Sequence, residues 1–156
     1  MRAAMEKMGL SPDLILVSSA KRTVQTLEAL EPWAETPLVD TLDSLYLASA
    51  SSLLKTLQDI PETVRSAMVV GHNPGLHELA MLLIGAHAMT LGNQEMRRLA
   101  EGYPSGALTE FMVPGAWHTL GEGGGRLVRF VCPRDLADPG QPPGQPPGQP
   151  PGQPAA

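Results

Sequence analysis

Residues 14–26 read LILVSSAKRTVQT, a short apolar run that leads directly into a polar stretch with helical spacing. A continuous apolar run of this length is typical of a strand covered on both faces. The helix predicted after it places Val24, Leu27 and Leu30 on one face and ends before Pro32. A buried strand that runs into a helix is the repeating unit of α/β folds, so this stretch indicates the fold class.

The same order recurs at residues 66–84, where SAMVVG precedes HNPGLHELAMLLI. Here Asn73 is predicted as the helix N-cap, Pro74 as the first helical residue and Gly85 as the stop. We therefore expect an α/β fold, a three-layer α/β/α sandwich with a mainly parallel sheet and an antiparallel hairpin at the C-terminal end. The remaining elements are predicted as helices over 1–10, 49–60 and 93–102, an extended segment over 37–40, and hairpin strands over 107–113 and 124–131.

Composition sets the domain organisation and the class of protein. Residues 139–156 repeat PGQP four times and end in Ala-Ala, which predicts a disordered, polyproline-like tail after one domain at 1–138. The net charge of −5, without a run of Lys or Arg, argues against nucleic acid, and the longest apolar stretch is too short for a membrane span. The single cysteine, Cys132, and the lack of a signal peptide favour a cytoplasmic protein.

Two of the predicted junctions place groups able to carry positive charge at one edge of the sheet. Arg22 lies in the first helical turn after the first strand, and His72 directly follows the second strand. Each residue alone is more often a surface or packed residue, but ligands of α/β sheets bind at this edge, where helix N-termini attract anions. A cation in a first helical turn costs about 0.3–1 kcal/mol, which a bound anion would offset. The pair therefore predicts a pocket for a phosphoryl group or a carboxylate.

Other polar residues form weaker patterns. The GEGGGR segment at 121–126 lacks the Lys and Ser/Thr of a phosphate-binding P-loop, and no GxSxG motif surrounds Ser18 or Ser19. No histidine or cysteine pair has metal-ligand spacing, so we expect no metal. His77, one turn into the second predicted helix, and the carboxylates Asp43 and Glu78 remain as candidates on position alone, with core or surface roles as the more common alternative. His87 and His118 are scattered and carry no pattern.

Five segments in this order resemble the phosphohistidine phosphatase branch of the histidine phosphatase superfamily, which is related to phosphoglycerate mutases. They are LILVSSAKRTVQT, LYLAS, VVGHNPGLHELAMLL, YPSGALTEF and GGRLVRFVCPRDL. The resemblance implies hydrolysis of a phosphoryl group through a covalent phosphohistidine, without a metal or organic cofactor. It assigns phosphate clamping to Arg22, donation to a phosphoryl oxygen and charge stabilisation to His72, and a further backbone N–H donor to Asn73. The implied partner is a phosphohistidine-bearing protein or a small phosphate ester.

One part of the family pattern has no counterpart. The family's first strand, which ends in Arg-His-Gly or Arg-His-Ala and carries the nucleophilic histidine, is missing, and none of the four histidines here follows an arginine. Our leading hypothesis is an N-terminally truncated phosphatase, with its start assigned too far downstream, that is inactive as given. The alternatives are a non-catalytic domain that binds phosphate or phosphoprotein, and a fragment that does not fold stably because two strand edges are exposed.

Overall fold

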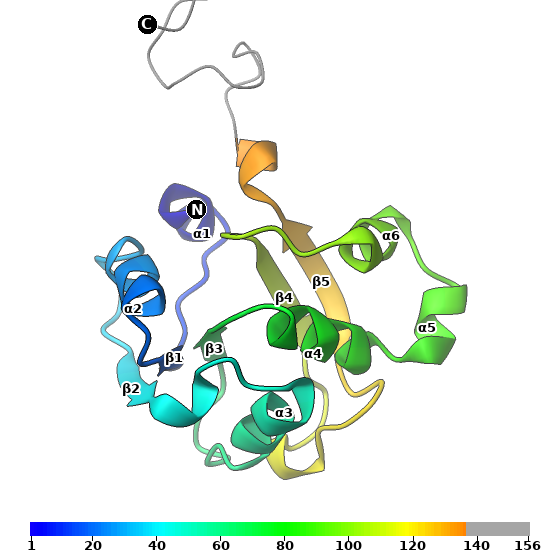
Figure 1. Cartoon of the computed structure of the whole chain (residues 1–156), viewed down its shortest axis with the longest axis horizontal. Coiled ribbons are helices and arrows are strands. Elements are labelled where there is room, and N and C mark those ends of the chain that lie inside the picture. The colour runs from blue at the N-terminus through cyan, green and yellow to red at the C-terminus, as the bar shows by residue number, and fades with distance from the viewer. Residues whose placement is uncertain (137–156) are drawn as a thin grey trace, which may run out of the picture.

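The structure, a computed structural model, describes residues 1–136 (Figure 1). The predicted PGQP tail at 139–156 and the two residues before it lie outside the described residues. The helices are α1 (Arg2–Lys7), α2 (Lys21–Glu28), α3 (Ala50–Gln58), α4 (Gly75–Ile84), α5 (Ala86–Thr90) and α6 (Gln94–Glu101). The strands are β1 (Leu14–Ser18), β2 (Leu38–Leu42), β3 (Ala67–Val70), β4 (Leu108–Met112) and β5 (Arg126–Val131). Short 3₁₀ turns cover Asp43–Leu45, Trp117–Thr119 and Pro133–Leu136.

β1 is the central strand of a three-stranded parallel sheet with the order β2-β1-β3. Its side chains alternate between two helical layers, as the pleat of a strand requires. Leu14 and Leu16 pack in a cluster with residues of α3 and α4, whereas Ile15 and Val17 pack with Leu27 of α2. The two predicted strand-to-helix stretches, 14–26 and 66–84, form β1 with α2 and β3 with α4, and the three-layer α/β/α arrangement is confirmed.

The predicted hairpin is also confirmed, as antiparallel pairing of β4 with β5. It forms a two-stranded sheet of its own, and Phe130 of β5 packs with Ala80 and Ile84 of α4. Within residues 1–136, β3 pairs only with β1, and β4 pairs only with β5. One edge of the parallel sheet therefore lacks a strand partner at β3, whose residues are also less buried than those of β1.

The start of α4 differs from the prediction. Asn73 is not the N-cap; Pro74 occupies that position and the helix begins at Gly75. The Asn73 side chain instead donates through its amide nitrogen to the carbonyl of Tyr103, at 2.7 Å, and this contact orients it. Gly85 does end α4, as predicted. Ser49 caps α3 by accepting from the backbone N–H of Ser52. No helix in the described part of the chain is long and apolar enough to cross a membrane.

Candidate functional site

The structure brings the two predicted site residues into direct contact. Arg22, from the first turn of α2, reaches His72 just after β3, and Arg22 Nη2 lies 3.0 Å from His72 Nδ1. The contact joins residues 50 positions apart because β1 and β3 are parallel neighbours, so the chain leaves both strands at the same edge of the sheet. Arg22 is exposed, whereas His72 is only 6% exposed.

Ser18, the last residue of β1, holds the other side of the imidazole. Its hydroxyl oxygen lies 2.7 Å from His72 Nε2, and Ser18 is completely buried. A guanidinium group has donors and no acceptor, so Nδ1 of His72 must accept from Arg22 and carries no proton. In a neutral imidazole the proton then lies on Nε2, which donates to Ser18. The two contacts together define both the tautomer and the orientation of His72.

The buried polar side chains lie together where β1 leads into α2 and where β3 ends. Among residues 1–136, the buried polar side chains are Ser18, Thr23 and His72. The hydroxyl of Thr23 lies 2.8 Å from the carbonyl oxygen of Ser18 and 2.7 Å from that of Ala20, which ties the first turn of α2 to the end of β1. Burying polar groups is unfavourable unless they are hydrogen-bonded, and here each of them is. The polar cluster therefore fixes where α2 leaves the sheet.

The electrostatics favour a neutral imidazole in the absence of an anion. Burial lowers the pKa of His72 from its usual value of 6.5, and the positive charge of Arg22 lowers it further. An anion placed between the two side chains would reverse the second effect. It would accept from the guanidinium, release Nδ1 and favour the imidazolium, which donates through Nδ1. The arrangement is thus able to bind an oxyanion and to supply one proton to it.

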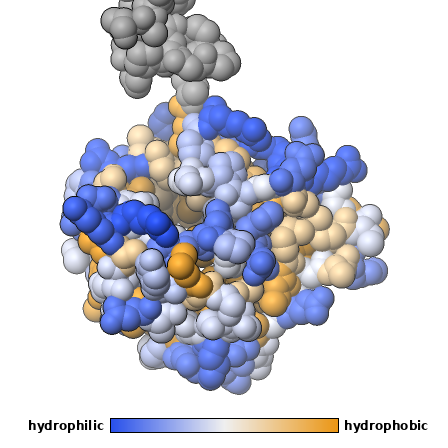
Figure 2. Space-filling model, in the orientation of Figure 1, coloured by the Kyte–Doolittle hydropathy of each residue, from blue (hydrophilic) through white to orange (hydrophobic). Residues whose placement is uncertain are grey.

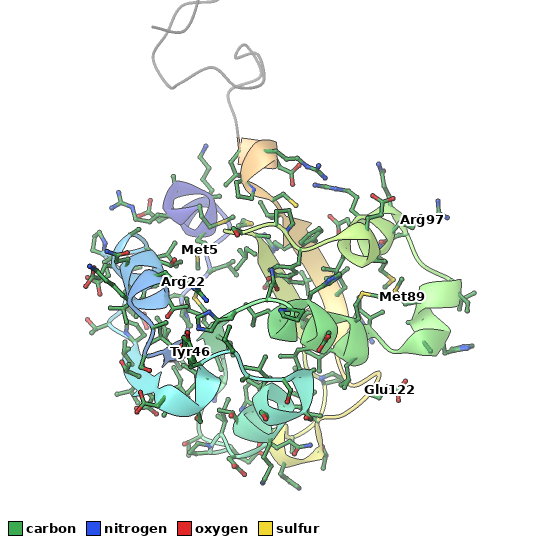
Figure 3. All side chains as sticks on the ribbon, viewed as in Figure 1. Met5, Arg22, Tyr46, Met89, Arg97 and Glu122 are labelled. Atoms are coloured by element: carbon green, nitrogen blue, oxygen red, sulfur yellow. The ribbon has the colours of Figure 1, made fainter. Side chains whose placement is uncertain are left out.

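Tyr46 is a further residue at the site, and neither its position nor its residue type indicated a role in the sequence. It follows the 3₁₀ turn Asp43–Leu45, and its ring centroid lies 5.4 Å from that of His72, with the planes at 75°. Figure 3 shows Tyr46 and Arg22 on different elements, Arg22 on α2 and Tyr46 just after the 3₁₀ turn. Tyr46 belongs to the LYLAS segment, which carried part of the family resemblance without marking this contact.

The other candidate residues do not join the cluster. His77 Nε2 contacts the carbonyl of Leu99 at 2.7 Å, His118 pairs with Glu62 at 3.2 Å, and His87 is exposed on α5. Asp43, Glu78 and Ser19 are exposed as well. Over residues 1–136 no three side chains of the His, Cys, Asp or Glu type are grouped to hold a metal ion.

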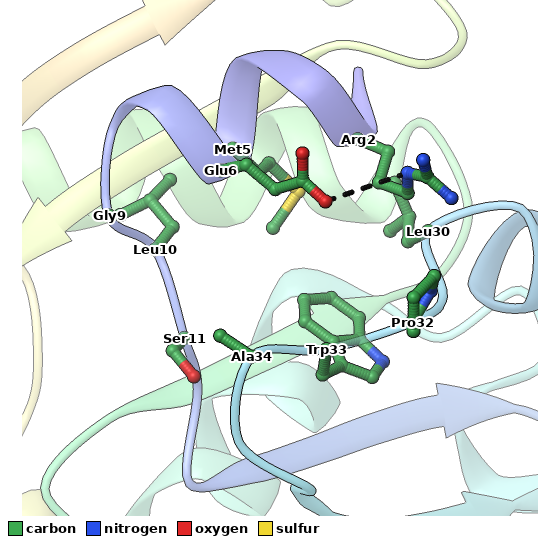
Figure 4. Close-up of a pocket in the computed structure, with 10 residues that line it drawn as sticks. All are labelled: Arg2, Met5, Glu6, Gly9, Leu10, Ser11, Leu30, Pro32, Trp33 and Ala34. Atoms are coloured by element: carbon green, nitrogen blue, oxygen red, sulfur yellow. Dashed lines mark ion pairs between the residues drawn. The ribbon is translucent and has the colours of Figure 1, made fainter.

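A cavity of about 160 Å³ lies elsewhere, between α1 and the segment after α2 (Figure 4). The side chains of Met5, Leu30 and Trp33 line it, and neither Arg22 nor His72 does. Its lining is mainly apolar, and its two charged residues, Arg2 and Glu6, pair with each other at 3.7 Å. We therefore take the edge of the parallel sheet as the candidate functional site.

Known proteins share this architecture. The structure provisionally named phosphohistidine phosphatase SixA from Nakamurella multipartitia has a TM-score of 0.71 and 23% identity, over 85% of this chain and 78% of that one. The chain has the SixA fold. A second structure with the same provisional name, from Agrobacterium tumefaciens, has a TM-score of 0.65 and 27% identity, over 85% of this chain and 74% of that one. The structure of the protein histidine phosphatase SixA complexed with tungstate has a TM-score of 0.62 and 16% identity, over 87% of this chain and 78% of that one.

Sequence comparison gives uncharacterized mycobacterial proteins. One from Mycobacterium leprae (strain TN) is 28% identical over 120 residues, 77% of this chain and 71% of its own length. Another from Mycobacterium tuberculosis (strain H37Rv) is 28% identical over 127 residues, 78% and 74% of the two chains. No protein-family model matches the sequence.

Proposed function

We propose that this chain is a phosphohistidine phosphatase-like domain whose site captures a phosphoryl group on Arg22 and His72. One observation carries the proposal: the 3.0 Å contact that joins an exposed guanidinium to a buried imidazole at the carboxyl edge of a parallel sheet. The guanidinium supplies two parallel donors for phosphoryl oxygens, and the imidazolium supplies a third through Nδ1. The backbone N–H of Asn73, next to His72, is a further donor in this proposal.

The proposed substrate class is supported by the fold neighbours, two of which are provisionally named phosphohistidine phosphatases. In the proposed reaction the phosphoryl group passes from the substrate to a nitrogen of a nucleophilic imidazole and then to water. His72 stabilises the charge on the phosphoryl oxygens in both steps, because its Nε2–H is committed to Ser18 and only Nδ1 faces the anion. The substrate is a phosphohistidine-bearing protein or a small phosphate ester.

The nucleophilic histidine is, in this proposal, not one of the four in this chain. His77 and His118 bond to other partners, His87 lies on α5, and His72 has the role of charge stabiliser. A strand ending in Arg-His, paired with the open edge of β3, would complete the site. An in-frame coding stretch upstream of Met1 for such a strand would support this assignment, whereas an in-frame stop close upstream would remove it.

The same observation supports one alternative, a domain that binds phosphate or phosphoprotein without turnover. Arg22 and His72 suffice for affinity, while hydrolysis through a covalent intermediate needs a second imidazole. The two functions differ in whether the site becomes phosphorylated once a strand ending in Arg-His completes it. The phosphatase function predicts that label passes from a ³²P phosphohistidine donor to the added histidine of a chain extended by such a strand, and that replacing this histidine by Asn abolishes the label. An extended chain that binds phosphate but takes up no label would favour the non-catalytic function.

Binding itself is tested by titrating the full chain with phosphate and with tungstate while following the imidazole resonances of His72 by NMR. We expect both anions to bind and Arg22→Ala to weaken binding by about 10- to 150-fold, since hydrogen bonds to charged groups contribute roughly 1.5–3 kcal/mol. Lys21→Ala, one residue away and also exposed, is the matched control for loss of a nearby positive charge. Equal losses in the two variants would mean that Arg22 is not the clamping residue.

A further inference from the structure

The aromatic ring of Tyr46 leaves much of its surface free beside the anion site. Tyr46 is 55% exposed although its ring contacts His72, and the next residue, Leu47, is 58% exposed. On the face of the molecule seen in Figure 2, hydrophobic atoms are scattered among hydrophilic ones rather than gathered into one large patch. The exposed surface at Tyr46 and Leu47 is therefore a small apolar rim, suited in size to one planar group rather than to a protein interface.

The rim is held in a fixed position. Leu45, one residue before Tyr46, is only 1% exposed and packs in the core cluster with α3 and α4. Leu47 has a φ of +47°, a left-handed conformation that leucine adopts rarely and that local packing must maintain. The carbonyl of Ala48 lies so close to Gly75, at the start of α4, that a Cβ at residue 75 would overlap it. A ring presented by such a segment loses little further conformational freedom when it binds a ligand.

We propose that Tyr46 stacks on a planar ring that carries the phosphoryl group, so that the site prefers a phosphoryl group on an aromatic or imidazole ring to one on an aliphatic alcohol. This inference rests on the proposed function, because it takes Arg22 and His72 as the partners of the phosphoryl oxygens. Tyr46 contacts the same imidazole that faces those oxygens, so the group bonded to the phosphorus lies within reach of the tyrosine ring. Offset or edge-to-face packing of two rings then adds to the affinity.

The test compares phenyl phosphate with methyl phosphate at pH 7.5, where both esters are mainly dianions, using isothermal titration of the full chain. Aromatic pairs contribute enough for phenyl phosphate to bind about two- to twelvefold more tightly than methyl phosphate. Tyr46→Ala is expected to remove this difference. Because Tyr46 contacts His72, the quantity compared is the ratio of the two ester affinities, in which a common change in phosphate binding cancels. Tyr46→Phe keeps the ring and is expected to keep the difference, which separates stacking from any role of the hydroxyl.

A second readout reports on contact rather than on stability. Stacking on Tyr46 shifts the phenyl proton resonances upfield through the tyrosine ring current, and the shift is expected to vanish in Tyr46→Ala. A preference for phenyl phosphate that survives in Tyr46→Ala would overturn the inference, as would equal binding of the two esters by the unchanged chain. If inorganic phosphate also fails to bind, the proposed function fails and this inference fails with it; if phosphate binds through Arg22, only this inference is lost.

Discussion

Removing the hydroxyl of Ser18 tests how the site holds His72. In Ser18→Ala the imidazole Nε2–H loses its acceptor at 2.7 Å while both residues stay buried. A buried donor left without a partner costs about 1–3 kcal/mol. The hydroxyl also accepts from the backbone N–H of Ala20, but at 3.3 Å this contact is longer and adds little. We therefore expect the free energy of unfolding to fall by about 2 kcal/mol.

Urea denaturation measures this change. With an m-value of about 2 kcal/mol/M for a domain of this size, the loss corresponds to a midpoint lower by about 1 M. Ser19→Ala is the matched control, because Ser19 is exposed and its substitution should change the free energy by less than about 0.5 kcal/mol. The nitrogen resonances of His72 give an independent readout: Nε2 stays protonated in Ser18→Ala, because Arg22 still donates to Nδ1, and its resonance shifts because the hydrogen bond to Ser18 is lost. If the two serine variants are equally stable, Ser18 does not fix the imidazole.

Three further predictions follow from the same contacts. Sulfate, whose charge is constant between pH 5.5 and 8, should bind more tightly as pH falls, by up to about tenfold per pH unit, because the bound anion favours protonated His72. A flat profile would mean that His72 takes up no proton when the anion binds. The pKa of His72 is lowered from 6.5 in the folded chain, so as pH falls the unfolded chain takes up the proton first. The free energy of unfolding should therefore decline below pH 6.5, and it should decline less in His72→Gln, which lacks the titrating group. Equal pH profiles of the two proteins in urea titrations would contradict the lowered pKa. Gly75→Ala should destabilise the fold by about 1–3 kcal/mol, because the new Cβ would overlap the carbonyl of Ala48. Gly102→Ala is the control, since nothing lies near a Cβ at that position, and it should hardly change the melting temperature. Similar melting temperatures of the two variants would refute the close approach of Ala48 to Gly75.

The sequence predicted those parts of the site that depend on topology. An apolar run followed by a helix places its last residues at the carboxyl edge of a parallel sheet, so Arg22 and His72 were expected to meet, and their side chains do. The pairing of β1 with β3 is what brings them together, and no local pattern was needed beyond the two strand-to-helix junctions.

The sequence did not predict contacts that depend on the choice between partners far apart in the chain. Asn73 has the residue type of an N-cap, yet its side-chain amide nitrogen donates to the carbonyl of Tyr103, 30 residues away. Ser18 and Ser19 are the same residue type, and only the pleat of β1 decides which hydroxyl turns towards His72. The helix α5 has five residues, too few for a hydrophobic period to be visible.

In the proposed anion site, the contact between Arg22 and His72 affects the release of the anion more than its capture. An arriving anion must displace the guanidinium from Nδ1, but Arg22 is exposed, and exposed side chains change rotamer within nanoseconds, far faster than ligands encounter the site at ordinary concentrations. Opening the contact therefore does not slow capture. Re-forming it after departure stabilises the empty site, which weakens the affinity and shortens the residence time of the anion. If the proposed function holds, such a site exchanges its ligand quickly and is a poor store of phosphate.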